Sequence, residues 1–464
     1  MTIMLAGDQR LSKSILWQIQ RQFFLEQGVH AWQADIVPHY ISTNPFMART
    51  YSKLILGYLR DISVSELDQT QPIYIIELGA GSGRLAYHFL HQFHDRLGHT
   101  TLSDIPIKFV MTDFVPETLA FWQAHDRFQP WLDAGLLDFA LFDAQAPAAL
   151  HLVHENLSLT PDKLQNPFVL IANYFFDSIP QDSFAIQDGQ LCENLLTVYS
   201  KQPEPNLGDP AIWDRLKLAY EAIPLQQPYY PDDDYNHILN LYEAYLPDTK
   251  LLFPNSGLDC LKFWQAYGNG RLLLISSDRG HSLVESLVDP GDPLPNLHGS
   301  FSMMVNYHAI GQYIQLQGGQ VLQASHYQSN LQVAAYLLGN TPQAGSETKL
   351  AFNDAVQSGG PDDFFSLKTA LEPTLAQLTL PQILSYLRLS GWDADIFQDC
   401  FPHLRKQILQ DTDTWHDDVY QVLLKIWQQY LPLQPADPLK QLIHILLTDM
   451  AYELDTFWNS VPVT

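Results

Sequence analysis

Glycines and an acidic residue cluster at one point of the 464-residue chain. Residues 77–83 read Glu-Leu-Gly-Ala-Gly-Ser-Gly, after a strand-like run over 73–77 and before a helix expected over 84–93. Glycines permit positive φ and let a ligand approach the backbone closely. The N-terminus of the following helix offers free N–H groups to an anionic group. This pattern predicts a ligand-binding loop between a strand and a helix.

Acidic residues end the next two strand-like runs. Asp113 follows the run over 107–112, and Asp143 follows the run over 136–142. In the class I methyltransferases that this set resembles, the first acid accepts hydrogen bonds from two ribose hydroxyls and the second lies beside the adenine. A dinucleotide loop needs a small residue where this chain has Arg84. The set resembles the cofactor site of class I S-adenosyl-L-methionine-dependent methyltransferases, with the cofactor residues Glu77, Gly79, Gly81, Gly83, Asp113, Asp143 and Asn173. The alternative is a tight strand–helix turn with two solvated acids.

A second polar segment, 173–180, follows the strand-like run over 168–172. Substrates of doubly wound sheets bind outside the carboxyl ends of the strands, so this segment is expected to face the transferred methyl group. We expect Asn173 to supply a carbonyl acceptor, Tyr174 an aromatic wall, and Asp177 a charge for a cationic substrate. Simpler alternatives are a strand-end cap for Asn173, core packing for Tyr174 and a helix N-cap for Asp177.

Residues 171–180, Ile-Ala-Asn-Tyr-Phe-Phe-Asp-Ser-Ile-Pro, resemble a signature of the MidA-type methyltransferases. Segments 42–46, 271–280 and 305–339 resemble other motifs of that family in the same order, so the resemblance covers roughly residues 11–340. The family includes a mitochondrial complex I assembly methyltransferase that acts on arginine. Tyr174 stands where the family has a glutamate that pairs with the target guanidinium, and Arg279 where it has a tyrosine.

Strand-like runs that alternate with helices predict the fold that must position these residues. We expect an α/β, class I Rossmann-like doubly wound, mostly parallel sheet. Residues 1–70 are expected to form an N-terminal helical segment, and 71–340 the methyltransferase core with a substrate insertion at 174–270. Residues 341–464 are expected to form a linker, over about 340–362, and an α-helical C-terminal region.

The composition argues against several classes of protein. The chain has 25 basic and 51 acidic side chains and a formal net charge of −26, which argues against nucleic-acid binding. No membrane span or export signal is visible. The three cysteines, Cys192, Cys260 and Cys400, are far apart, and the histidines show no metal-ligand spacing. We therefore expect a cytoplasmic protein without a metal site.

The leading hypothesis is an S-adenosyl-L-methionine-dependent methyltransferase acting on a side-chain nitrogen of a protein or peptide, with arginine as a candidate. Residues 174–270 hold 5 basic and 14 acidic side chains, and the last 124 residues hold 7 and 16, which favours a cationic substrate. The alternatives are a small-molecule methyltransferase with the insertion as a lid, or a non-catalytic scaffold whose helical tail binds a protein partner. A homodimer is left open.

Overall fold

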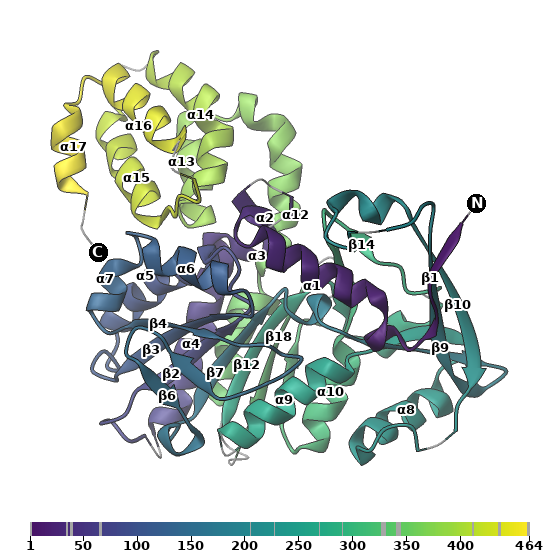
Figure 1. The fold of residues 1–464 in the computed structure, drawn as a ribbon. Coiled ribbons are helices and arrows are strands. Elements are labelled where there is room, and N and C mark those ends of the chain that lie inside the picture. The colour runs from purple at the N-terminus through teal and green to yellow at the C-terminus, as the bar shows by residue number, and fades with distance from the viewer. Residues whose placement is uncertain are drawn as a thin grey trace.

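A sheet of seven strands forms the centre of the computed structural model, and the strands are β2 (Ile73–Leu78), β3 (Ile107–Asp113), β4 (Leu137–Leu141), β7 (Phe168–Asn173), β12 (Leu272–Asp278), β17 (Gln320–Gln323) and β18 (Gln332–Leu338). Their spatial order is β17-β18-β12-β7-β2-β3-β4 (Figure 1). Strands β12, β7, β2, β3 and β4 pair in parallel, whereas β18 is antiparallel to both β12 and β17. The predicted α/β fold is confirmed, and its sheet is mixed.

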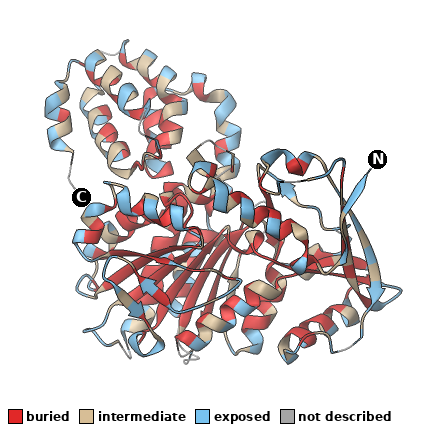
Figure 2. Ribbon diagram, viewed as in Figure 1, coloured by how far each residue is buried: buried red, intermediate tan, exposed pale blue. Residues whose placement is uncertain are grey.

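Helices cover both faces of this sheet. Alternate residues of β2 point to opposite sides: Ile73 and Ile75 pack with α4 (Pro45–Ser63) and α5 (Arg84–Gly98). Tyr74 and Ile76 share the opposite core with α9 (Asn255–Tyr267) and α10 (Tyr307–Leu316). Because both faces are covered, the central strands are continuously buried, which explains their unbroken apolar runs (Figure 2).

The structure describes residues 2–33, 36–37, 40–64, 67–204, 206–226, 228–268, 270–289, 291–325, 331–339, 345–410, 413–434 and 438–461. Short elements complete the core: α6 (Pro116–Ala124), α7 (Gln129–Asp133), β5 (Leu150–Leu152), β6 (Leu157–Leu159), β13 (Gly280–His281), β14 (Asn296–Leu297), β15 (Phe301–Ser302) and β16 (Val305–Asn306). Within the described residues, no helix is both long and apolar enough to span a membrane.

The insertion at 174–270 carries most of a second, antiparallel sheet. The insertion contributes four strands to this sheet: β8 (Asp182–Gln187), β9 (Gln190–Ser200), β10 (Leu216–Pro224) and β11 (Thr249–Phe253). Helix α8 (Asp233–Tyr245) lies between β10 and β11 in the chain. The N-terminal strand β1 (Ile3–Gln9) pairs with β9, so the N-terminal segment, predicted to be helical, begins with a strand. This strand lies at the edge of the sheet with no fully buried residue, and it therefore leaves no alternating apolar pattern in the sequence.

The rest of the N-terminal segment is helical, with α1 (Ile15–Gln27), α2 (His30–Gln33) and α3 (Tyr40–Thr43) leading into α4. In Figure 1 the purple helix α1 passes in front of the sheet. Asn44 caps α4 by accepting a hydrogen bond from the Met47 N–H at 2.9 Å, and Pro45 occupies the first helical position. This cap fixes where the chain leaves α3 and turns towards the core.

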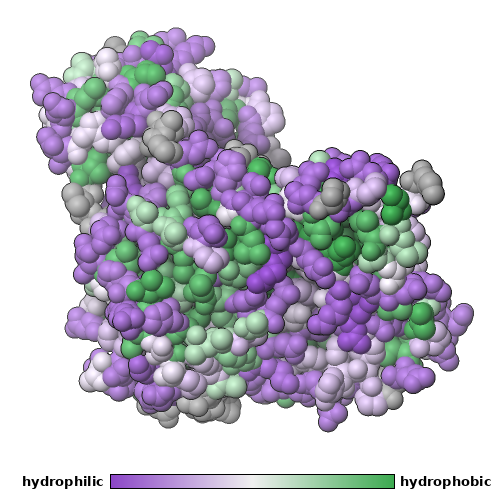
Figure 3. Space-filling view, viewed as in Figure 1, coloured by the Kyte–Doolittle hydropathy of each residue, from purple (hydrophilic) through white to green (hydrophobic). Residues whose placement is uncertain are grey.

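The C-terminal residues form a lobe of helices that stands out from the core (Figure 1, Figure 3). The lobe consists of α12 (Pro361–Leu371), α13 (Leu380–Ser390), α14 (Ala394–Ile408), α15 (His416–Gln429), α16 (Pro438–Asp449) and α17 (Leu454–Ser460), whereas α11 (Ser346–Phe352) belongs to the core. The prediction of a linker over 340–362 is wrong for 346–357, because α11 and the π-helical turn Asn353–Gln357 pack against α4. The Asp61 carboxylate accepts the Thr348 N–H at 2.8 Å and holds this segment in place.

Candidate active site

A cavity of about 600 Å³ opens at the carboxyl ends of β2, β7 and β12. Five parts of the chain line it: the N-terminal helices, the glycine loop, the segment after β7, the segment after β12, and α12. These parts include Phe24, Trp32, Tyr40, Ser42, Glu77, Gly79, Gly81, Asn173, Tyr174, Asp177, Arg279, His298, Ser302, Phe365 and Lys368. The site therefore combines segments that are far apart in the sequence.

The glycine loop turns sharply between β2 and α5. Gly79, Gly81 and Gly83 have φ values of 68°, 53° and 78°, in the region that favours glycine. A Cβ atom added to Gly81 would lie 2.8 Å from the Trp32 ring, and one added to Gly83 would lie 2.9 Å from the Met111 methyl group. Gly79 and Gly81 line the cavity, whereas Gly83 turns the chain into α5 beneath it.

Glu77 lies at the end of β2 with only 3% of its surface exposed. Its Oε2 atom is buried, and no described residue forms a hydrogen bond with it. Burial, with a smaller contribution from the nearby Asp113 charge, raises the pKa of Glu77 to about 8. A buried carboxylate at the wall of a cavity is suited to a cationic group, such as the ammonium of an amino-acid ligand.

The two predicted acids beyond the loop make bonds within the protein. Asp113 accepts the N–H groups of Gly81 at 3.2 Å and Val115 at 3.0 Å, and burial raises its pKa to about 6. It therefore braces the glycine loop from behind. Asp143 pairs with Arg21 of α1 at 2.6 Å, and the Arg21 guanidinium lies over the Phe114 ring. Neither acid lines the cavity, and their contacts to ribose and adenine stay predictions.

The Asn173 side chain makes three hydrogen bonds within the protein. Its Oδ1 accepts the hydroxyl groups of Tyr51 at 2.9 Å and Ser277 at 2.6 Å. Its Nδ2 donates to the Ser42 carbonyl at 2.8 Å. The oxygen that the sequence suggested as a proton acceptor is therefore occupied, and Asn173 ties the end of β7 to the segment before α4. Tyr51, in the middle of α4, was not predicted to take part.

Tyr174 borders the cavity in a strained backbone conformation. Its φ is 51°, which costs a non-glycine residue roughly 1–2 kcal/mol. Its N–H is held by the Ser277 carbonyl at 2.8 Å. Strain of this kind persists only where the surroundings enforce it, and Tyr174 lines the cavity, while its role as an aromatic wall for the acceptor stays a prediction.

The strain leads to a prediction on stability. Tyr174→Gly and Tyr174→Ala both remove the ring, but only glycine relaxes at positive φ, so the glycine variant is expected to be the more stable by about 1 kcal/mol. At the exposed helical position Tyr245 the same pair should show the opposite order, because alanine favours a helix. Urea unfolding of the four variants measures both differences, and a more stable Tyr174→Ala protein would show that this backbone is unstrained.

Asp177 and Asp278 form a buried pair of carboxyl groups at the ends of η3 (Phe176–Ser178) and β12. The Asp177 N–H donates to Asp278 Oδ2 at 3.0 Å, and the Ser178 hydroxyl donates to Asp177 Oδ1 at 2.7 Å. Burial raises the pKa of both groups, and for Asp278 the neighbouring Asp177 charge raises it further. A carboxylate with a raised pKa holds a proton more readily than an exposed one, so Asp177 in its ionised form can accept a proton.

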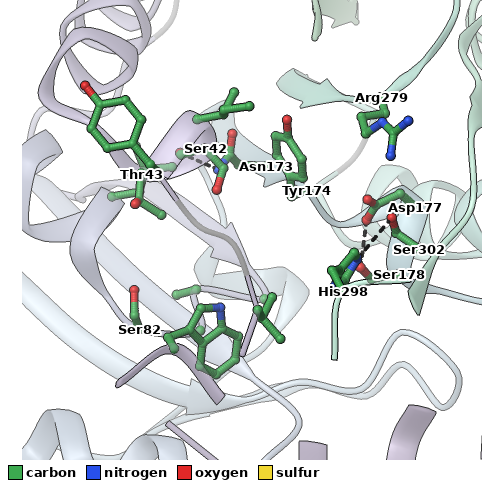
Figure 4. Close-up of a pocket in the computed structure, with 18 of the residues that line it drawn as sticks. Ser42, Thr43, Ser82, Asn173, Tyr174, Asp177, Ser178, Arg279, His298 and Ser302 are labelled. Carbon is green, nitrogen blue, oxygen red and sulfur yellow. Dashed lines mark hydrogen bonds between the residues drawn. The ribbon is translucent and has the colours of Figure 1, made fainter. Parts of the chain in front are cut away.

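Three further side chains complete this wall: Arg279, His298 and Ser302. Figure 4 shows them with Asp177 on one side of the cavity, and Ser42, Thr43 and Asn173 on the other. His298 lies 3.3 Å from the Ser302 hydroxyl through Nε2, and its pKa is lowered by burial. Within the described residues no group of three His, Cys, Asp or Glu is arranged to hold a metal ion.

Residues 62–275 match the model of a protein family described as "Putative S-adenosyl-L-methionine-dependent methyltransferase". No curated protein matches the sequence. A solved protein of an uncharacterized superfamily from Burkholderia thailandensis is 14% identical with a TM-score of 0.44, covering 74% of this chain and 90% of that one. A second member from that organism, described as a "likely methyl transferase" and bound to S-adenosyl-homocysteine, is 13% identical with a TM-score of 0.45, covering 73% and 91%.

The region that matches the family model contains the glycine loop, both loop acids and the segment after β7. The buried carboxylate of Glu77 and the positive φ values of the loop are the features that such a cofactor site requires. The chain is an S-adenosyl-L-methionine-dependent methyltransferase that uses S-adenosyl-L-methionine as its cofactor.

Proposed function

We propose that this enzyme methylates a side-chain nitrogen of a protein or peptide, at the cavity wall formed by Tyr174 and Asp177. Under this proposal, the core that carries the site has the class I, Rossmann-like doubly wound fold, with antiparallel strands at one edge of its sheet. The observation that carries the proposal is the position of Asp177, which borders the same cavity as the glycine loop and whose N–H donates to Asp278.

The cofactor, when bound, supplies a methyl group on a positively charged sulfur. Backbone groups of Gly79 and Gly81 would hold its amino-acid part, and the Glu77 carboxylate would pair with its ammonium group. The remaining residues of the cavity align the acceptor and keep water out. Orientation of this kind supplies a large part of the rate enhancement in a two-substrate reaction.

A nitrogen acceptor loses a proton when it is methylated, so the site needs a proton acceptor. Asp177 supports this role because it is buried, borders the cavity and lies beside the Asp278 carboxyl group, to which its backbone N–H donates. Its raised pKa makes the carboxylate a stronger base than an exposed aspartate. Tyr174 would form the wall against which the acceptor lies.

Arginine is the specific acceptor suggested by the resemblance to the MidA-type family. Asp177 is the acid available to pair with a guanidinium, since Tyr174 cannot form a bidentate ion pair. A small-molecule acceptor is the second candidate, and it is favoured by the closure of the cavity on several sides by α3, α12 and the segment after β12. A protein partner for the helical tail and a homodimer stay predictions.

The test uses the full chain with S-adenosyl-L-methionine tritiated in the methyl group, mixed with a cell extract. We expect radioactivity in precipitable protein, and mass spectrometry of the labelled protein to place it on nitrogen. Label only in the soluble small-molecule fraction would support the second candidate instead. No label in either fraction, with no heat on titrating S-adenosyl-homocysteine, would rule out both.

A further inference from the structure

Arg279 is a cation of the cavity wall that has no counterion among the residues the structure describes. It follows Asp278 at the end of β12, and its side chain is partly buried. Its backbone is bonded, since its N–H donates to Asp278 Oδ1 and its carbonyl accepts the Val305 N–H. Its guanidinium, by contrast, makes no hydrogen bond or ion pair with any described residue. A guanidinium carries five N–H donors, and none of those of Arg279 is bonded within the described part of the chain.

The neighbouring acids Asp278 and Asp177 make their hydrogen bonds with groups other than the Arg279 guanidinium. Asp278 Oδ1 and Oδ2 accept the N–H groups of Arg279 and Asp177, and Asp177 Oδ1 accepts the Ser178 hydroxyl. The other cation of the cavity, Lys368, is already paired with Glu372 and lies over the Tyr40 ring. Arg279 is therefore the cavity cation whose charge is left uncompensated by the described residues.

A second unsatisfied group lies on the same side of the cavity. The Nδ1 atom of His298 is buried and has no hydrogen-bond partner in the described part of the chain. Ser302 and Asn296 border the cavity beside it and carry hydrogen-bonding groups of their own. Figure 4 shows Arg279, His298 and Ser302 grouped around Asp177. A guanidinium with neighbouring neutral donors is the arrangement that binds carboxylate and phosphate oxygens.

The two departures from the MidA-type motifs act in the same direction. An acid is replaced by Tyr174, and a tyrosine by Arg279, so the ends of β7 and β12 lose one negative charge and gain one positive charge relative to those motifs. Both side chains face the same cavity. The side of the cavity that receives the acceptor is therefore more positively charged, which favours the binding of an anion.

We propose that the methyl acceptor carries an oxyanion, a carboxylate or a phosphate, which Arg279 binds while the acceptor nitrogen lies at Asp177. This inference rests on the proposed function, because it describes the acceptor of the same site. Such an acceptor carries both a positive and a negative group. The acidic excess of residues 174–270 attracts the positive group, and Arg279 binds the negative group. A peptide with an acidic residue beside the methylated one has this chemistry, as does a small amino acid.

The first experiment measures anion binding without turnover. The protein saturated with S-adenosyl-homocysteine is titrated calorimetrically with inorganic phosphate and, separately, with malonate. Either anion should bind, and Arg279→Gln should weaken binding by roughly tenfold or more, whereas Arg279→Lys keeps part of it. The two anions distinguish a phosphate group from a carboxylate. Equal affinity in wild type and Arg279→Gln, or no binding of either anion, would overturn the proposal.

A matched control is Arg388→Gln, which removes the same charge from an exposed position on α13 and should leave anion affinity unchanged. The second experiment repeats tritium labelling with extract fractions separated on an anion exchanger. Label should appear in retained molecules and fall about tenfold with Arg279→Gln. Label in unretained molecules that Arg279→Gln does not reduce would overturn the inference but leave methyl transfer established. The calorimetric result decides the inference even if no fraction is labelled.

Discussion

Glu77→Gln is expected to weaken S-adenosyl-homocysteine binding by roughly 10- to 100-fold, because it removes the buried carboxylate proposed to pair with the ligand ammonium. Wild-type affinity should rise as the pH approaches about 8, where Glu77 ionises, and binding should release a proton. Calorimetry in two buffers of different ionisation enthalpy measures that proton. Glu117→Gln, an exposed change on α6, serves as the control.

The same substitution should make the empty protein more stable at alkaline pH. The pKa of Glu77 is raised from 4.5 to about 8, so between these values the folded chain keeps a proton that the unfolded chain has released. The free energy of unfolding therefore falls as the pH rises through this window. Glutamine does not ionise and so avoids this loss. At pH 8.5 we expect the free energy of unfolding of the Glu77→Gln variant, measured in urea, to exceed that of the wild type by about 2 kcal/mol. A variant that binds the ligand normally, or that is no more stable, would contradict the role given to Glu77.

Asp177→Asn is expected to lower kcat by about 10²–10³-fold, because it removes the carboxylate proposed to take the proton from the acceptor. The affinity for S-adenosyl-homocysteine should change little, since the glycine loop and Glu77 are untouched. In the wild type kcat should rise with pH as Asp177 ionises, at a pH above the usual range of an aspartate because its pKa is raised. This acidic limb should be lost in the variant.

Two further aspartate variants separate this role from a structural one. Asp278→Asn keeps a hydrogen-bond donor beside Asp177, so it should lose much less activity than Asp177→Asn. Asp138→Asn changes an equally buried aspartate that accepts backbone N–H groups far from the cavity, and it should lower stability without lowering kcat. If Asp177→Asn turns over at the wild-type rate, Asp177 is not the proton acceptor.

The central strands and the glycine loop could be predicted from the sequence because their signals are local. The apolar runs that end at Glu77 and Asp113 are strands, and the positive φ of Gly79, Gly81 and Gly83 explains why glycine stands there. The partners of these residues could not be predicted. The bond of Asn173 to Tyr51 and the pairing of Asp143 with Arg21 join residues 122 positions apart.

The other residues of the cavity wall were harder to predict from the sequence. His298 had no metal-ligand spacing, and Arg279 stood out only as a departure from a motif. Lys368 and Phe365 reach the site because α12 packs beside α4, where Phe46 and Phe364 stack at 4.5 Å. Such placement depends on tertiary packing that no local periodicity records.

Because α12 forms part of the cavity wall, the cavity can be completed only after α12 has been synthesised. The region that matches the methyltransferase family ends at residue 275, yet the cavity wall includes residue 368. A nascent chain that has emerged only to the end of β18 has its glycine loop but an open site, with the α4 surface that later receives α11 and α12 still bare. We therefore expect ribosome-arrested chains ending before α11 to be cleaved readily by protease even with S-adenosyl-homocysteine present, and the full chain to be protected. Equal protection of both would show that the site closes without the C-terminal helices.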